Sequence, residues 1–275
     1  MLAVDWSGAA VRAERRIWLA EALDGRRLAR LVSDYSRGGL ASHLLEEVAR
    51  TPRMVIGFDF AFGFPAWFSQ RELQAEAGPA VWAKVAQQGE AWLAACAVPF
   101  WGRPGCPRPP EPTSPALRWT ERAVTPVNGI RPKSVFQIGG AGSVGTGSLR
   151  GMPILASLHA AGACVWPFQS GGWPLVVEIY PRLLTLGVVK SSRVARASYL
   201  AGHCPGLAPE HRRDAVRSED AFDAAVSALV MARYLADLEA LPPEPDPRVR
   251  LEGRIWHPDW RRDAEQRPSG SLQFG

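Results

Sequence analysis

Ser218-Glu-Asp-Ala-Phe-Asp-Ala-Ala-Val-Ser-Ala-Leu-Val-Met231 is the stretch around which the rest of the chain is organised. Ala225 and Leu229 recur at helical spacing, with Phe222 and Val226 beside them, so the pattern predicts a helix with one apolar face. The alanines would let this face approach a sheet closely. Two acids near the start of the stretch would give the helix a charged end.

Asp220 and Asp223 are three residues apart and therefore share one side of the expected helix. Ser218 is a good N-cap, and negative charge in the first turn is favoured by about 0.3–1 kcal/mol, which by itself would explain Asp220. Asp223 lies beyond the first turn and gains little from the helix dipole. It needs another explanation, for which other parts of the chain supply candidates.

The composition is that of an ordinary globular protein, with 275 residues of which 47% are hydrophobic. That length can bury one large core or two closely joined halves. No apolar run reaches about 18 residues, and the N-terminus runs straight into an expected strand, so we expect neither a membrane span nor a signal peptide. These patterns favour a cytoplasmic protein. The four cysteines form no C-x-x-C pair, which argues against zinc and against a disulfide framework.

The basic residues are mostly arginine, and the net charge is +5. The planar guanidinium group suits phosphate recognition. Coding bias produces the same composition, so the charge permits nucleic-acid binding without identifying it.

Three expected strands open the chain, over residues 2–6, 16–22 and 28–35, with Asp24-Gly25 as a hairpin signal. The first strand ends at Asp5 and is followed by a turn. An aspartate in that position can simply cap an Asx-turn. A functional role for Asp5 becomes the better interpretation because two later strands also carry acids.

The later acids are Asp59, in the apolar run 54–65, and Glu178, in Leu175-Val-Val-Glu-Ile-Tyr-Pro181. Both runs are typical of strands buried on both faces. An ionised carboxylate in such surroundings is strongly disfavoured unless it is paired or binds a cation. We therefore expect Asp59 at the end of its strand, facing a site, and a structural role alone does not explain Glu178.

The remaining segments are assigned more coarsely. We expect helices over residues 40–49, 66–96, around 154–161 and through 182–217, a short strand over 134–138, an edge strand over 251–256, and a loose tail from residue 261.

A Pro- and Arg-rich segment of about residues 97–133 interrupts the expected fold. A segment this long without regular structure is usually a functional lid, a binding loop or a disordered excursion. Arg118, Arg131 and Lys133, near Trp101 and Trp119, are residues that an electrostatic groove with stacking surfaces would use. A solvated loop explains the same composition equally well.

The glycine-rich sequence 139–151 contains Gly140-x-Gly142-x-x-Gly145, the letters of a dinucleotide fingerprint. The match is weak because no acid follows about 20 residues later, and the sequence lacks the Gly-Lys-Ser/Thr end of a P-loop. The sequence still fits a loop whose backbone amides meet a substrate phosphate at the head of the following helix, and we expect Gly142 and Ser143 to be the contacts.

The five acids would meet at one place, because strand ends and the helix packed over them converge in an α/β sheet. Carboxylates this close repel one another and become partly protonated unless cations lie among them. Oxygen ligands suit Mg²⁺ or Mn²⁺, and two such ions about 3.5–4 Å apart activate water and stabilise a leaving oxygen in phosphodiester cleavage.

Several short motifs, taken together, carry a family resemblance. They are Val4-Asp-x-Ser-Gly8 before a three-strand meander, the acid in the central strand, Val176-Val-Glu-Ile-Tyr-Pro181, Asp220-x-x-Asp-Ala-Ala225, Arg118-x-Thr-Glu121 and Glu252-Gly-x-Ile255. The combination resembles a bacterial and archaeal domain-of-unknown-function family described as predicted RNase H-like nucleases. More remotely, the acidic pair is similar to that of RuvC-type junction resolvases.

The resemblance implies one RNase H-like α/β domain over residues 1–256, a mixed sheet flanked by helices with the insertion at about 97–133, and a tail over 257–275. It implies that Asp5, Glu178, Asp220 and Asp223 hold metal, and Asp59 would assist them in catalysis. The expected activity is metal-dependent hydrolysis of DNA or RNA.

Two other functions stay open. An actin-like ATPase or phosphotransferase shares the same core, although that architecture needs a duplicated core and a second glycine-rich loop. A catalytically inactive nucleic-acid-binding module would keep the fold and bind no metal.

Overall fold

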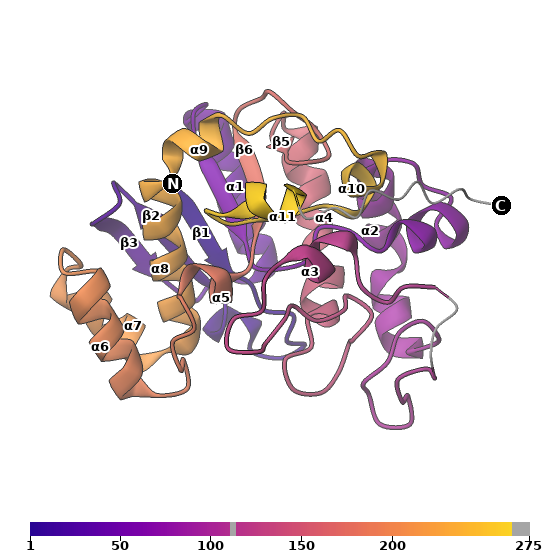
Figure 1. Ribbon diagram of the computed structural model, residues 1–275, viewed down its shortest axis with the longest axis horizontal. Coiled ribbons are helices and arrows are strands. Elements are labelled where there is room, and N and C mark those ends of the chain that lie inside the picture. The colour runs from indigo at the N-terminus through magenta and orange to yellow at the C-terminus, as the bar shows by residue number, and fades with distance from the viewer. Residues whose placement is uncertain (111–113, 266–275) are drawn as a thin grey trace.

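The computed structural model describes residues 1–110 and 114–265. Seven strands within these residues form one sheet in the order β3-β2-β1-β4-β6-β5, and β7 also pairs with β6. The strands are β1 (Leu2–Asp5), β2 (Trp18–Ala22), β3 (Leu28–Val32), β4 (Val55–Phe58), β5 (Cys164–Val165), β6 (Leu175–Ile179) and β7 (Ile255–Trp256). The strands β1 to β3 pair antiparallel, and β4, β5, β6 and β7 join by parallel pairing. The protein is therefore α/β, with a mixed sheet flanked by helices (Figure 1).

Helices cover both faces of the sheet. The longer ones are α1 (Arg37–Arg50), α2 (Gly78–Ala95) and α4 (Gly145–Ala160) on one face, and α6 (Arg193–His203), α7 (Pro209–Arg217) and α8 (Glu219–Arg233) on the other. Shorter elements are η1 (Ala13–Arg15), η2 (Phe68–Glu72), α3 (Trp119–Ala123), α5 (Pro181–Leu184), α9 (Leu235–Glu239), α10 (Pro247–Glu252) and α11 (Trp260–Glu265).

The strand alternation sorts side chains between two cores. In β1, Leu2 and Val4 join the core beneath α1, α2 and α4, whereas Ala3 joins the core beneath α8. This is the two-residue period expected of a strand with helices on both faces. The short Ala3 side chain leaves room for α8 to lie close to the sheet.

Helix α8 confirms the prediction from its sequence. It begins after Ser218, whose side chain accepts a hydrogen bond from the Ala221 amide, and every residue from 221 to 231 is buried. Gly57 in β4 lies beneath it, since a Cβ there would be 2.6 Å from the Met231 sulfur. The close approach of α8 to the sheet therefore depends on small residues on both sides.

Around the glycine-rich stretch, one sequence prediction is wrong and another is confirmed except for its start. Residues 134–138 form no strand and make only a single bridge between Trp101 and Gln137. The helix expected near residue 154 begins at Gly145. A Cβ at Gly145 would lie 2.2 Å from the Val135 carbonyl oxygen, so glycine is what allows the helix to start against this neighbouring segment.

Three further differences concern short elements. The expected edge strand over 251–256 is limited to β7, because α10 continues to Glu252. The segment 97–133 contains the helix α3, and its residues 111–113 lie outside the described part. In the expected tail, residues 260–265 form α11 and residues 266–275 lie outside the described part.

None of the helices formed by residues 1–110 and 114–265 is long and apolar enough to cross a membrane.

The fit of α8 on the sheet can be tested by enlarging Gly57. Gly57→Val should lower the free energy of unfolding by about 1–3 kcal/mol, because the added methyl groups overfill the space beneath Met231. Gly38→Val is the matched control: Gly38 has open space around it, and we expect a change within about 0.5 kcal/mol. Urea denaturation measures both, and an equal loss in the two variants would contradict the packing described.

Candidate functional site

The predicted acids converge at one edge of the sheet. Asp5 ends β1, Asp59 follows β4 directly, and Glu178 lies in β6, and these three strands are parallel neighbours. The Asp59 amide donates to the Val4 carbonyl at 3.1 Å, which fixes the two strand ends beside each other. Helix α8 brings Asp223 to the same place.

Burial and the charges of neighbouring acids raise the pKa values of several of these carboxylates. Burial raises the pKa of Asp5 well above its usual range, and Asp59, Asp223 and Asp220 raise it further. Burial, followed by the charge of Asp223, raises the pKa of Asp59 to about 7. The pKa of Asp223 rises to about 6, again chiefly through burial. Asp59 is therefore partly protonated near neutral pH, and the protonated forms of Asp5 and Asp223 are also favoured unless a cation stabilises the ionised forms.

Lys190 supplies one such cation. Its ammonium group donates to Oδ2 of Asp223 from the loop between α5 and α6. Burial by itself lowers the pKa of Lys190, but the Asp223 carboxylate beside it, with smaller contributions from Asp59 and Asp5, raises it overall. The other oxygen, Oδ1 of Asp223, is buried and has no hydrogen-bond partner within the described part of the chain.

Glu178 is held by a different cation, Arg118. The guanidinium group donates to both oxygens of Glu178, at 2.8 and 2.5 Å, and the Phe62 amide donates to Oε2 at 2.9 Å. Arg118 is 1% exposed and also donates to Glu121 at 2.6 Å. Both oxygens of Glu178 are therefore engaged, and Arg118, which we expected to contact substrate, is a buried partner of this carboxylate.

Glu121 is the second acid on Arg118 and was named in the sequence only as part of a motif. Its pKa rises to about 7, because burial and the nearby charge of Glu178 outweigh the attraction of Arg118. One arginine thus faces two buried carboxylates, which leaves this group with an excess of negative charge or a bound proton.

Over the part of the chain that the structure describes, no group of three or more His, Cys, Asp or Glu side chains is arranged to hold a metal ion. The ion pairs to Lys190 and Arg118 occupy oxygens of two of the four acids that the sequence predicted as ligands.

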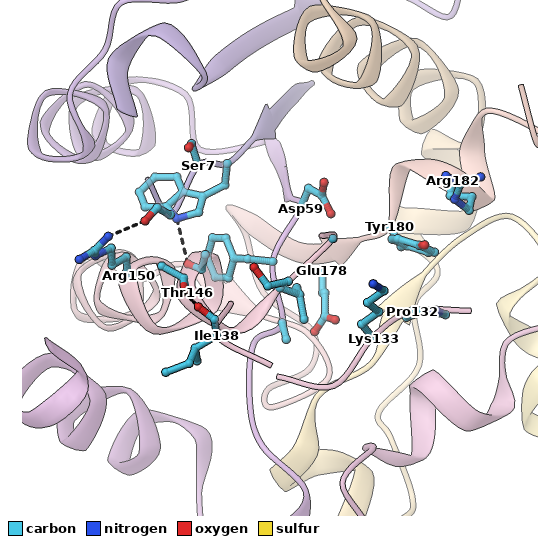
Figure 2. A pocket seen from close by; sticks show the side chains of 18 of the residues that line it. Ser7, Asp59, Pro132, Lys133, Ile138, Thr146, Arg150, Glu178, Tyr180 and Arg182 are labelled. Atoms are coloured by element: carbon cyan, nitrogen blue, oxygen red, sulfur yellow. Dashed lines mark hydrogen bonds between the residues drawn. The ribbon is translucent and has the colours of Figure 1, made fainter. Parts of the chain in front are cut away.

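Two cavities border the carboxylates. The larger, of about 710 Å³, is lined by Asp59 and Glu178 and by the predicted substrate contacts Arg118, Arg131, Lys133, Gly142 and Ser143 (Figure 2). Its other basic lining residues are Arg16, Arg103, Arg150, Arg182 and Lys190. The smaller, of about 410 Å³, is lined by Asp5 and Asp220. Trp6, Ser7 and Arg16 line both cavities, so the two adjoin, and the larger one is strongly basic.

Basic side chains of the loops around the larger cavity make hydrogen bonds to backbone carbonyl oxygens of the same loops. Arg131 donates to the carbonyl oxygens of Arg122 and Val124, and Lys133 donates to that of Ala141. Neither side chain pairs with a carboxylate in these bonds, so both keep positive charge at the cavity wall.

The turn after β1 rests on the start of α4. A Cβ at Gly8 would lie 2.4 Å from the Gly147 nitrogen, and Trp6 donates from its indole to the Gly147 carbonyl at 3.1 Å. Arg150 of α4 donates to the Gly8 carbonyl at 2.5 Å. The glycine-rich sequence therefore serves a close approach of two backbones, which places the first turn of α4 at the cavity.

Sequence reasoning missed Lys190 as a site residue and placed it in a basic helical segment. One signal was present: the lysines of this arginine-rich chain are Lys84, Lys133 and Lys190 only. A lysine is a compact point charge that arginine does not replace well, so a lysine in an otherwise arginine-rich chain is a signal for a site residue.

The raised pKa of Asp59 predicts a dependence of stability on pH. Between the ordinary value of 3.8 and about 7, folded Asp59 holds a proton that the unfolded chain has released, so the free energy of unfolding should fall as pH rises through this range. In EDTA, Asp59→Asn should flatten this fall, because asparagine does not titrate. Urea denaturation across the pH range measures the free energy of unfolding, with Glu76→Gln, at an exposed position, as control. An unchanged slope in Asp59→Asn would contradict the assignment.

Arg118→Met removes the partner of two buried carboxylates. We expect it to lower the free energy of unfolding by about 3–5 kcal/mol, since the charges of Glu121 and Glu178 are left uncompensated. Arg122→Met, at an exposed position of the same helix, should change it by no more than about 0.5 kcal/mol. Similar losses in both variants, measured by urea denaturation, would argue against the buried ion pair.

Comparison of the chain with protein-family models, with curated proteins and with solved structures yields no match.

Proposed function

We propose that this chain is a metal-dependent nuclease or phosphodiesterase of RNase H-like fold, which hydrolyses nucleic-acid phosphodiester bonds with metal-activated water. One observation carries the proposal: Asp5 of β1, Asp59 directly after β4 and Asp223 of α8 come to one place. There, in addition to burial, the charges of Asp59 and Asp223 raise the pKa of Asp5, and the charge of Asp223 raises the pKa of Asp59. An N-terminal three-strand meander continued by parallel strands also agrees with the RNase H-like resemblance.

The donor set fits Mg²⁺ or Mn²⁺. Carboxylate oxygens are the ligands that these hard cations prefer. The buried and unpartnered Oδ1 of Asp223 is a donor without another use among the described residues. Asp5 and Asp59 would rotate toward it to complete the site, and Asp220, at the first turn of α8, would assist. Such an ion would supply a low-pKa water and stabilise the leaving oxygen.

Glu178 has a different role in this proposal from the one expected of a simple ligand. Its bidentate bond to Arg118 and its bond from the Phe62 amide hold it rigidly at the end of β6. Glu178 would therefore act on the site through its negative charge, which raises the pKa of Asp59. Direct contact between Glu178 and a metal ion would require Arg118 to release one of the two carboxylate oxygens.

The basic lining of the larger cavity fits a polyanionic substrate. Arg103, Arg150 and Arg182 add to Arg131 and Lys133 around a space that Asp59 also borders. Positively charged groups along a groove neutralise backbone phosphates and make binding dependent on salt. A nucleic-acid strand in this cavity would bring a phosphodiester to the carboxylates.

A nuclease assay with Mg²⁺ or Mn²⁺ on single-stranded, duplex and branched DNA and RNA tests the proposal. We expect cleavage by the wild type that EDTA abolishes. Asp5→Asn and Asp223→Asn should each lower the rate at least about 100-fold, because loss of a ligand should cost more than loss of an outer-shell partner. Glu76→Gln, at an exposed position, should leave the rate unchanged.

Cleavage that persists in EDTA, or in both aspartate variants, would contradict the proposal. ATP hydrolysis without nucleic-acid cleavage would favour the actin-like alternative. Salt-sensitive binding of nucleic acid that survives both substitutions, again without cleavage, would favour the binding module.

A further inference from the structure

Lys190 places a positive charge among the carboxylates of the candidate metal site. Its ammonium group contacts Asp223 and is close enough to Asp59 and Asp5 for both carboxylates to raise its pKa. The side chain is 17% exposed and lines the larger cavity, so the lysine that contacts Asp223 also borders this space.

The backbone of Lys190 is fixed beside α8. The buried guanidinium group of Arg196 donates to the Lys190 carbonyl and, at 2.7 and 3.2 Å, to the Val216 carbonyl in the last turn of α7. Helix α8 follows α7 after a single residue, Ser218. Arg196 therefore ties the loop that carries Lys190 to the junction that positions Asp223.

A second contact holds the loop from the other side. The Asn128 side chain donates to the Gly187 carbonyl at 2.8 Å, and a Cβ at Gly187 would lie 2.8 Å from the same amide nitrogen. Hydrogen bonds to the carbonyl oxygens of Gly187 and Lys190 therefore hold the loop at both ends of the segment 187–190. This arrangement orders the long side chain before substrate arrives, which lowers the entropy cost of using it.

The charges also favour one divalent ion with a lysine over two divalent ions. Asp5, Asp59 and Asp223 together carry three negative charges when ionised. The charge of Asp220 is offset by the nearby Arg16, and Arg118 together with a proton on Glu121 offsets the Glu178 and Glu121 pair. One divalent ion and one ammonium group balance the three carboxylates. A second divalent ion would compete with Lys190 for the same oxygens and would meet its positive charge at close range.

We propose that Lys190 takes the place of a second divalent cation: the site binds one Mg²⁺ or Mn²⁺, and the Lys190 ammonium group supplies the second positive charge toward the substrate phosphate. The inference rests on the proposed metal-dependent function and departs from the two ions expected from the sequence. A lysine suits this place because its charge is compact, whereas a guanidinium fork would spread across several carboxylates.

The number of Mn²⁺ ions bound per chain, measured by isothermal titration calorimetry without substrate, tests the inference. Wild type should bind one ion. Lys190→Met should bind two, because it keeps a flexible chain of similar length and removes the charge. Lys84→Met is the matched control, because Lys84 is an exposed lysine of α2. This variant should bind one ion. Circular dichroism checks the folding of each variant, and Lys190→Gln replaces Lys190→Met if the latter is unfolded.

The outcomes separate this inference from the proposed function. Two ions on wild type, or one ion on both wild type and the Lys190 variant, would overturn the role of Lys190 and leave metal-dependent hydrolysis standing. No ion on wild type would overturn the proposed metal chemistry and the inference together.

Discussion

The placing of several carboxylates away from water at one site, reinforced by repulsion among them, is the constraint on which the rest of the site depends. Asp5, Asp59 and Asp223 would not remain ionised together without opposite charge, since burial and their neighbours both favour the protonated forms. Two basic side chains supply this opposite charge. Lys190 pairs with Asp223, and Arg118 pairs with Glu178. The cluster therefore links the sheet, α8 and two loops electrostatically.

The two cations, Arg118 and Lys190, differ in their burial and in the number of hydrogen bonds that they make. Arg118 is fully enclosed and makes hydrogen bonds with Glu121, Glu178 and the Glu252 carbonyl, which is a geometry that rigidifies. Lys190 makes one side-chain bond, leaves Oδ1 of Asp223 unpartnered among the described residues, and borders the cavity. Arg118 therefore stabilises the framework, whereas Lys190 contacts one of the acids and borders the larger cavity.

Local signals in the sequence predicted much of the fold. The N-cap Ser218, the apolar spacing behind it and the acids at strand ends all depend on near neighbours, and the structure brings those acids together. The partners of the acids were beyond such signals. Arg118 is 60 residues from Glu178 and Lys190 is 33 residues from Asp223, so nothing in the spacing relates them. The start of α4 was missed because its glycines serve tertiary contact, which local propensity disfavours.

The most direct measurement is a crystal structure of the wild-type protein soaked with Mn²⁺, with anomalous diffraction used to locate the ion. The central claim is that Asp5, Asp59 and Asp223 form the ion site. We expect one anomalous peak within coordination distance of these three carboxylates, with Lys190 beside it and the Arg118–Glu178 pair intact. An absence of any peak at these acids, or a peak held by Glu178 after Arg118 has moved away, would contradict the claim.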